Sequence, residues 1–85
     1  MNYRLEYDRA ALRAIESLPR KLQQRIIGRI ASLAINPRPH GSIKFTNQDA
    51  YRIRVGDYRI IYTIFDERLV VLIIDVGNRR DVYRR

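Results

Sequence analysis

The chain has 85 residues, of which 46% are hydrophobic, and it carries 17 Lys and Arg against 9 Asp and Glu. This length predicts a single domain, residues 1–85, with enough apolar residues for a packed core. The absence of cysteine excludes disulfides, thiolate zinc sites and cysteine nucleophiles, and the single histidine excludes a His-rich metal site.

Nothing in the sequence predicts a membrane segment or a signal peptide. The longest uncharged apolar run near the C-terminus, 69–74, has six residues, whereas a membrane span needs about 20. The N-terminus carries charges where a signal peptide would have an apolar run. We therefore expect a cytoplasmic protein with no membrane partner.

The basic residues are biased toward arginine, with 15 Arg and only 2 Lys. The planar guanidinium fork binds phosphate in a bidentate manner and stacks on bases. This bias predicts an anionic partner, and nucleic acid is the simplest one.

The first half of the chain predicts a strand followed by two helices. Residues 2–7 are expected to form the strand, and Asp8 is a residue type that caps a following helix. Apolar residues at helical spacing predict helices over 9–18 and 20–35, with Pro19 between them. The segment Asn-Pro-Arg-Pro-His-Gly that follows predicts a loop.

From residue 42 onward the apolar pattern has a period of two, which predicts strands over 42–46, 50–55, 58–65 and 68–76. Gly77-Asn78 is expected to end the last strand, and 81–85 to form a short helical turn. The last strand is apolar on both sides, so it should be central. The fold class is therefore α+β: an N-terminal strand, a helical hairpin, and a three- to four-stranded, mainly antiparallel meander packed on the helices.

A two-residue loop at Gly56-Asp57 would fix the register of the strands on either side. That register places Arg54 directly opposite Arg59, with Arg52 on the same face. Like charges in direct opposition destabilise a sheet, and no acidic residue is expected between these arginines. The alternative is an ordinary solvated strand face, but the direct opposition favours a binding site.

The last strand should bring Arg79 beside the same pair, with Tyr83 four residues later. If this face is a site with a cost in stability, Arg54→Gln or Arg59→Gln should leave the free protein as stable or slightly more stable.

Guanidinium groups clustered in this way would supply positive charge where negative charge grows during phosphoryl transfer. A metal-dependent nuclease needs converging carboxylates, and the acidic residues here are expected mostly at turns and strand ends. The sequence thus favours metal-free chemistry without a cofactor, and RNA can be cleaved without a metal because its 2′-hydroxyl can attack the neighbouring phosphate. Arginine, with a pKa above about 12, is a poor general base, so catalysis should be mostly electrostatic and positional.

Two motifs occur in order in the second half: YRIRVGDYRIIY at residues 51–62 and VGNRRDVY at residues 76–83. They are similar to the YRxRxGDYRxxY and VGxRxxVY patterns of the RelE/ParE toxin superfamily of bacterial toxin–antitoxin systems. The resemblance covers effectively the whole chain. It implies a RelE-like toxin that cuts messenger RNA on the ribosome and so inhibits translation.

The resemblance also implies roles by position. Arg54 stands at the position of the proposed general base, and Arg59 matches the arginine that holds the phosphate. Arg79 matches the proposed general acid or leaving-group stabiliser, and Tyr83 the tyrosine that stacks on the nucleotide. These four are the predicted catalytic residues, and the predicted RNA-binding residues are Arg52, Arg80, Arg84 and Lys44.

The sequence departs from the family pattern at two positions. Arg54 replaces a residue that is often lysine, so base catalysis there is in doubt. Asn78 stands where many relatives have histidine, so a histidine-assisted mechanism is not available at that position.

The implied partners are the ribosome with its messenger RNA, and a cognate antitoxin that is acidic and partly disordered when free. The toxin–antitoxin complex would bind its own operator DNA through the antitoxin. Two alternatives stay open: a ParE-like inhibitor that binds DNA gyrase, and a non-catalytic basic RNA-binding module.

Overall fold

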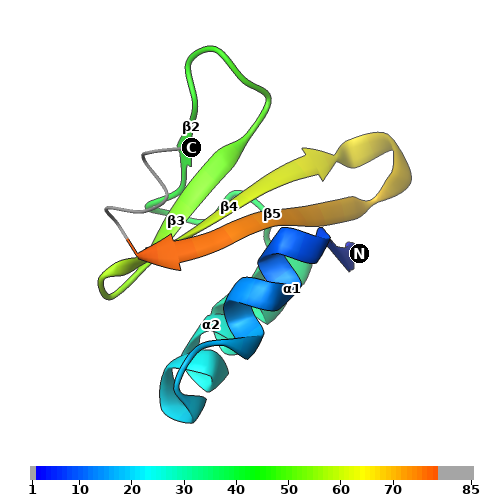
Figure 1. Ribbon diagram of the computed structural model, residues 1–85. Coiled ribbons are helices and arrows are strands. Elements are labelled where there is room, and N and C mark those ends of the chain that lie inside the picture. Colours follow the sequence, from blue (N-terminus) through cyan, green and yellow to red (C-terminus); the bar gives the residue numbers. More distant parts are fainter. Residues whose placement is uncertain (1, 79–85) are drawn as a thin grey trace.

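A computed structural model of the chain describes residues 2–78 (Figure 1). Strand β1 (Arg4–Tyr7) is followed by helices α1 (Arg9–Glu16) and α2 (Arg20–Ile35). Four further strands then alternate with turns: β2 (Ile43–Lys44), β3 (Tyr51–Val55), β4 (Tyr58–Phe65) and β5 (Val70–Asn78), with a short 3₁₀ helix, η1 (Asp66–Arg68), between the last two.

The strands form one five-stranded sheet in the order β1-β5-β4-β3-β2. β2 to β5 pair in an antiparallel manner, whereas β1 runs parallel to β5. The two helices lie together against one face of this sheet (Figure 1). The predicted α+β class, the meander and the central position of the last strand are confirmed. Within residues 2–78, neither helix has the length and apolar character that crossing a membrane requires.

The core lies between the helices and the sheet. The Asp8 side chain accepts a hydrogen bond from the Arg9 backbone N–H and so caps α1. In α2, Ile26, Ile30 and Leu33 recur at helical spacing and are fully buried. They pack with apolar residues that alternate along the strands, namely Ile53, Val55, Ile60, Tyr62, Ile64, Val71, Ile73 and Val76.

The turn between β3 and β4 has the expected two-residue form. Gly56 has φ +60°, and Asp57 is not among the residues with positive φ. Glycine with positive φ at the first turn position is the pattern of a type II′ turn, whose twist matches that of the flanking strands. The resulting register pairs Val55 with Tyr58 and Arg54 with Arg59, as predicted.

Several predicted boundaries are wrong. β1 begins at Arg4, α1 ends at Glu16, and β5 begins only at Val70 because η1 and the left-handed Leu69 (φ 53°) come first. β5 also continues through Asn78, because β4 supplies ladder partners for its last two residues. A bulge at Ile74 shifts the register between the two halves of this ladder. The predicted turn at 81–85 lies outside the described residues.

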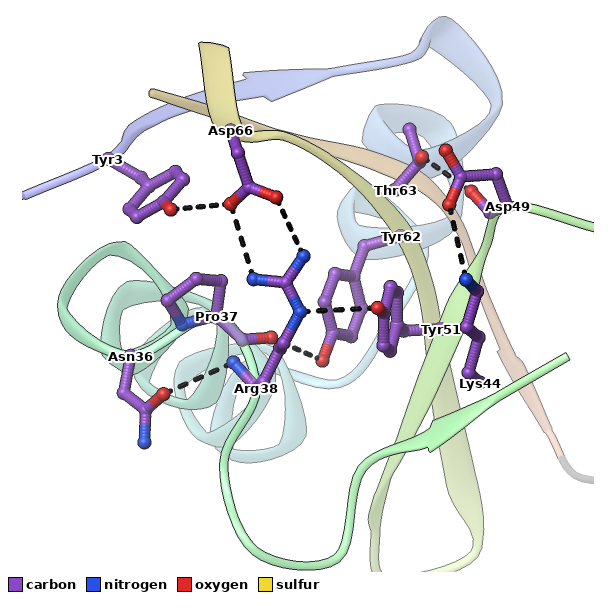
Figure 2. Close-up of polar contacts among 10 residues, drawn as sticks. All are labelled: Tyr3, Asn36, Pro37, Arg38, Lys44, Asp49, Tyr51, Tyr62, Thr63 and Asp66. Carbon is purple, nitrogen blue, oxygen red and sulfur yellow. Dashed lines mark hydrogen bonds and ion pairs between the residues drawn. The ribbon is translucent and has the colours of Figure 1, made fainter. Parts of the chain in front are cut away.

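A polar cluster that we call the clasp closes the end of the fold opposite the β3–β4 turn (Figure 2). Arg38, in the loop after α2, binds both Asp66 carboxylate oxygens, at 2.8 and 3.2 Å, and donates from Nε to the Tyr51 hydroxyl at 3.2 Å. The Tyr3 hydroxyl donates to Asp66 at 2.6 Å. The buried Tyr62 stacks on Tyr51 and donates to the Pro37 carbonyl at 2.8 Å. The clasp therefore ties the N-terminus, the α2–β2 loop and η1 to the sheet.

The clasp shifts the pKa of its acidic member. Hydrogen bonds from Arg38, and then from Tyr3, lower the pKa of Asp66 from 3.8 to about 2. About half of each partner's side chain is exposed, 45% for Arg38 and 53% for Asp66, so solvent screens the pair and its contribution to stability is small.

We predict that the clasp makes stability depend on acid pH. A carboxylate whose pKa is lower in the folded than in the unfolded chain stabilises the fold above the unfolded value. This contribution should be lost as the pH falls from 3.8 to about 2. The measurement is urea unfolding of wild type and Asp66→Asn at successive pH values.

The difference in unfolding free energy between the two proteins should shrink toward zero across that window. Tyr3→Phe removes one donor to Asp66 and should give an intermediate profile. A wild-type minus Asp66→Asn difference that stays constant between pH 5 and pH 2 would contradict this account.

Candidate functional site

Three predicted site residues share the sheet face that turns away from the helices. Because Ile53 and Ile60 point into the core, Arg52, Arg54 and Arg59 lie on the opposite face, which we call the arginine face. Arg54 is registered directly against Arg59, and Arg52 against Ile61. The structure thus brings together the three arginines that the sequence placed there.

These arginines differ in exposure. Arg54 is exposed, Arg52 is partly buried, and Arg59 is only 2% exposed. Asp75, itself 8% exposed, is registered against Ile61 and so lies on the same face, one diagonal step from Arg59. No acid alternates with the arginines along β3 and β4, as expected, but Asp75 stands diagonally next to Arg59 on the side away from Arg54. The acid comes from β5, and strand alternation within β3 and β4 could not reveal it.

A basic groove of about 480 Å³ runs along the edge of β3. Its described lining combines Arg29 of α2 with Arg52 and Arg54 of β3, together with Gly41, Ile43 and Ile53. Arg54 also lines a small pocket of about 20 Å³ at the β3–β4 turn, together with Arg59. Arg54 therefore lies where the groove meets the small pocket that it shares with Arg59.

Sequence reasoning missed Arg29. Its position on the polar side of α2 looked like an ordinary solvated helix face. The signal that could have found it is the i, i+4 spacing of Arg25 and Arg29, which puts two guanidinium groups on one side of the helix. An Arg25 Nη2 lies 3.6 Å from where a Cβ on Gly56 would stand, so this side of α2 faces the β3–β4 turn.

The other predicted residues lie elsewhere or outside the described part. Lys44 pairs with Tyr51, so the two side chains share the sheet face opposite the arginine face, which we call the clasp side. The Lys44 Nζ lies 4.0 Å from an Asp49 carboxylate oxygen. The predicted Arg79, Arg80, Tyr83 and Arg84 lie outside the described residues. Asn78, the last described residue, is registered against Tyr58 and therefore lies beside the β3–β4 turn that separates Arg54 from Arg59.

The described residues offer no obvious metal centre. Within 2–78, no three His, Asp or Glu side chains gather in a way that could hold a metal ion. The arginine face instead offers fixed positive charge and several donors, which suit a phosphate group.

Comparison with known proteins identifies the family. The family model for the ParE toxin of the type II toxin–antitoxin system parDE matches residues 5–83. The chain belongs to this toxin family. Both motifs singled out in the sequence lie within the matched range, and the predicted membership of the RelE/ParE superfamily is confirmed.

Two curated relatives of this ParE-family toxin carry RelE-type names. The mRNA interferase toxin RelE of Escherichia coli K12 is 28% identical over 81 residues, covering 93% of this chain and 85% of its own. Toxin RelG of Mycobacterium tuberculosis is 29% identical over 87 residues and covers all of both chains.

Solved structures of relatives have the same fold. The RelE–RelB complex of Pyrococcus horikoshii matches with a TM-score of 0.79 and 29% identity, covering 93% of this chain and 97% of that one. The intact E. coli RelBE complex matches with a TM-score of 0.80 and 27% identity, covering 89% and 95%.

The difference in burial changes the expectation for the two arginine variants. Arg54→Gln should leave the free toxin as stable or slightly more stable, because it relieves repulsion worth roughly 0.2–1 kcal/mol at an exposed position. Arg59→Gln should instead destabilise by about 1–3 kcal/mol, because Arg59 is only 2% exposed and the substitution changes the polar contacts of a buried side chain. Urea unfolding of both variants at pH 7 checks this.

Equal stability loss in the two variants would contradict the assignment of Arg54 as the exposed member. A stabilised Arg59→Gln would contradict the structural role that burial gives to Arg59.

Proposed function

We propose that this toxin is a ribosome-dependent, metal-free endoribonuclease that cuts messenger RNA and thereby inhibits translation in the cytoplasm. The observation that carries the proposal is the direct opposition of Arg54 and Arg59 on one sheet face, at the end of a basic groove. The RelE-type names of the curated relatives, among them an mRNA interferase, support it.

The proposed reaction uses the substrate's own nucleophile. The 2′-hydroxyl oxygen attacks the adjacent phosphorus and gives up its proton to solvent water, the bond from phosphorus to the 5′-oxygen breaks, and the leaving 5′-oxygen takes up a proton. The products are a 2′,3′-cyclic phosphate and a 5′-hydroxyl. Arg54 and Arg59 would stabilise the extra negative charge on the phosphate oxygens, and Arg52 would bind the RNA beside them.

The remaining roles rest on the sequence motif alone. Arg79 would stabilise or protonate the leaving oxygen, Tyr83 would stack on a base, and Arg80 and Arg84 would bind RNA. Lys44 is a weaker candidate for RNA binding, since its register position is on the clasp side of the sheet.

The proposed protein partner is a cognate antitoxin that is acidic and partly disordered until bound. Two solved relatives are complexes of RelE with RelB. Excess positive charge, with 17 basic against 9 acidic residues, would speed the encounter with an acidic chain and make it sensitive to salt. The complex would bind its operator DNA through the antitoxin.

A second candidate function is inhibition of DNA gyrase by binding, since the matching family is described by the ParE toxin. A gyrase inhibitor needs a docking surface but no opposed arginines. A variant of Arg54 that folds normally would then be expected to keep its toxicity. A plain basic RNA-binding module would likewise cut nothing.

The test is cleavage of a defined messenger RNA on programmed ribosomes, in parallel with a gyrase supercoiling assay. Toxin stripped with EDTA and desalted should still cut, with the ribosomes kept intact in Mg²⁺. The fragments should carry a 2′,3′-cyclic phosphate and a 5′-hydroxyl by mass spectrometry. A message with 2′-O-methyl groups at the cleaved site should resist, because its nucleophile is blocked.

Cleavage of the methylated message, or fragments that carry a 5′-phosphate, would contradict the mechanism. Inhibition of gyrase without any RNA cleavage would establish the second candidate instead.

Variants of the C-terminal motif test the roles assigned there. Arg79→Ala should lower the single-turnover cleavage rate by about 10²–10³-fold, the usual effect of removing one donor from a developing charge. Tyr83→Ala should destabilise the transition state by roughly 1–3 kcal/mol through lost stacking and so lower the cleavage rate. Tyr83→Phe keeps the ring and should retain most activity. Arg13→Gln, at an exposed position on α1, is the charge-matched control.

Wild-type rates in both Arg79→Ala and Tyr83→Ala would show that the motif's roles do not apply to this chain. A loss in Tyr83→Phe as large as that in Tyr83→Ala would assign the hydroxyl, and not the ring, to the reaction.

A further inference from the structure

The groove beside β3 exists because its neighbouring strand is very short. β2 pairs with β3 only at Ile43–Arg52 and Lys44–Tyr51. Beyond Arg52 the edge of β3 has no ladder partner among the described residues on that side, and Ile53, whose side chain is buried in the core, borders the groove there. The opposite wall comes from α2 through Arg29, and from the α2–β2 loop through Gly41.

The groove is open on the Gly41 side. Gly41 has φ +94°, a left-handed conformation that side chains rarely adopt, and nothing lies within 4 Å of where its Cβ would be. The clasp fixes this loop from its other end through Arg38. A ligand backbone can therefore approach the loop closely without displacing a side chain.

The charges of the groove are all of one sign. Arg29, Arg52 and Arg54 contribute three guanidinium groups, and no acidic side chain belongs to its described lining. Arg25 stands one helical turn before Arg29, beside the β3–β4 turn, and extends the positive surface. Such a groove attracts a polyanion and, with forked donors, favours phosphate.

The groove also offers apolar contacts at one end. Ile43 is 50% exposed and lines it, and the Phe45 ring lies 5.9 Å from the Arg52 guanidinium. Phe45 is half-buried and does not itself line the groove, so Ile43 is the exposed apolar side chain beside these charges. Positive charge next to an exposed apolar side chain suits a nucleic-acid strand whose backbone follows the charges. Its volume of about 480 Å³ lies in the usual range of ligand sites, roughly 300–1,000 Å³.

We propose that this groove is a subsite for the RNA strand next to the cleaved bond, and that Arg29 of α2 is an RNA-binding residue that holds a flanking phosphate. The inference rests on the proposed function and deepens it. Arg54 belongs to both the groove and the small pocket shared with Arg59, so a strand lying in the groove would lead directly to the reacting phosphate.

The first test is binding without a ribosome. The probe is a fluorescein-labelled, single-stranded 2′-O-methyl RNA of about 12 nucleotides, which cannot be cut and spans a typical single-strand site. Fluorescence anisotropy over a salt series should give Arg29→Gln an affinity about tenfold below wild type. The slope of log affinity against log salt should fall by about 0.7, the contribution of one cation on a single strand.

Two variants serve as controls. Arg29→Lys keeps the charge but loses the fork, so it should restore the salt slope and only part of the affinity. Arg13→Gln makes the same charge change at an exposed position on α1, which packs against β5 and not on the groove, and it should match wild type. Thermal unfolding of each variant shows whether it is folded.

The second test separates this inference from the proposed function. On programmed ribosomes, Arg29→Gln should need about tenfold more toxin for half-maximal cleavage while keeping the saturated rate, as expected for lost binding without lost chemistry. If wild type cuts RNA and Arg29→Gln behaves like Arg13→Gln in both assays, the subsite is wrong and the proposed function stands. If wild type cuts nothing, the proposed function fails first.

The other possible occupant is an acidic protein segment. A labelled poly-glutamate peptide distinguishes it, because the proposal expects the peptide to bind far more weakly than the RNA. If Arg29→Gln loses affinity for the peptide and retains full affinity for the RNA, the groove is a protein-docking site and the proposal is overturned.

Discussion

The two-residue turn at Gly56-Asp57 is the constraint on which the rest of the structure depends. Because side chains alternate along a strand, fixing the register of β3 against β4 decides both faces of the sheet at once. Ile53 and Ile60 meet the helices, and Arg54 therefore has to meet Arg59 on the other side. A slip of one residue would bury the arginines against α2 and expose the core, so the hydrophobic contacts that stabilise the fold also hold the two like charges in opposition.

The sheet carries structural polar contacts at one end and the candidate reaction site at the other. At the end where β3 begins, the clasp joins Arg38 and Asp66 to stacked tyrosines and holds the chain's early and late segments together. At the end where β3 turns into β4, Arg54 and the groove supply positive charge. Arg59 belongs to both functions, since it lies on the arginine face and is nearly fully buried there. Buried charge of this kind is costly unless other groups in the fold compensate for it, which favours a functional reason for keeping it.

Local patterns predicted the helices, the meander and the Arg54–Arg59 opposition, because each follows from apolar periodicity or from turn chemistry within a few residues. Contacts between distant segments could not be predicted in this way. Asp75 reaches the arginine face only through the β4–β5 ladder, and Arg29 reaches the groove only because β2 is too short to cover the β3 edge. Gly77 looked like a strand end, but pairing with β4 overrides its weak strand propensity. Lys44 is predicted to bind RNA; the two-residue register of β2 places it on the same sheet face as Tyr51, away from the arginine face, and its role stays a prediction.

The central claim is that Arg54 and Arg59 act on one phosphate. A double-mutant cycle of single-turnover cleavage rates on programmed ribosomes tests it most directly, with Arg54→Gln, Arg59→Gln and the double variant. Residues that act as a unit on the same transition state are strongly non-additive. The account predicts that the double variant loses little more activity than the worse single variant, while all three remain folded. Losses that multiply independently would show that the two arginines serve separate steps, and would contradict the account.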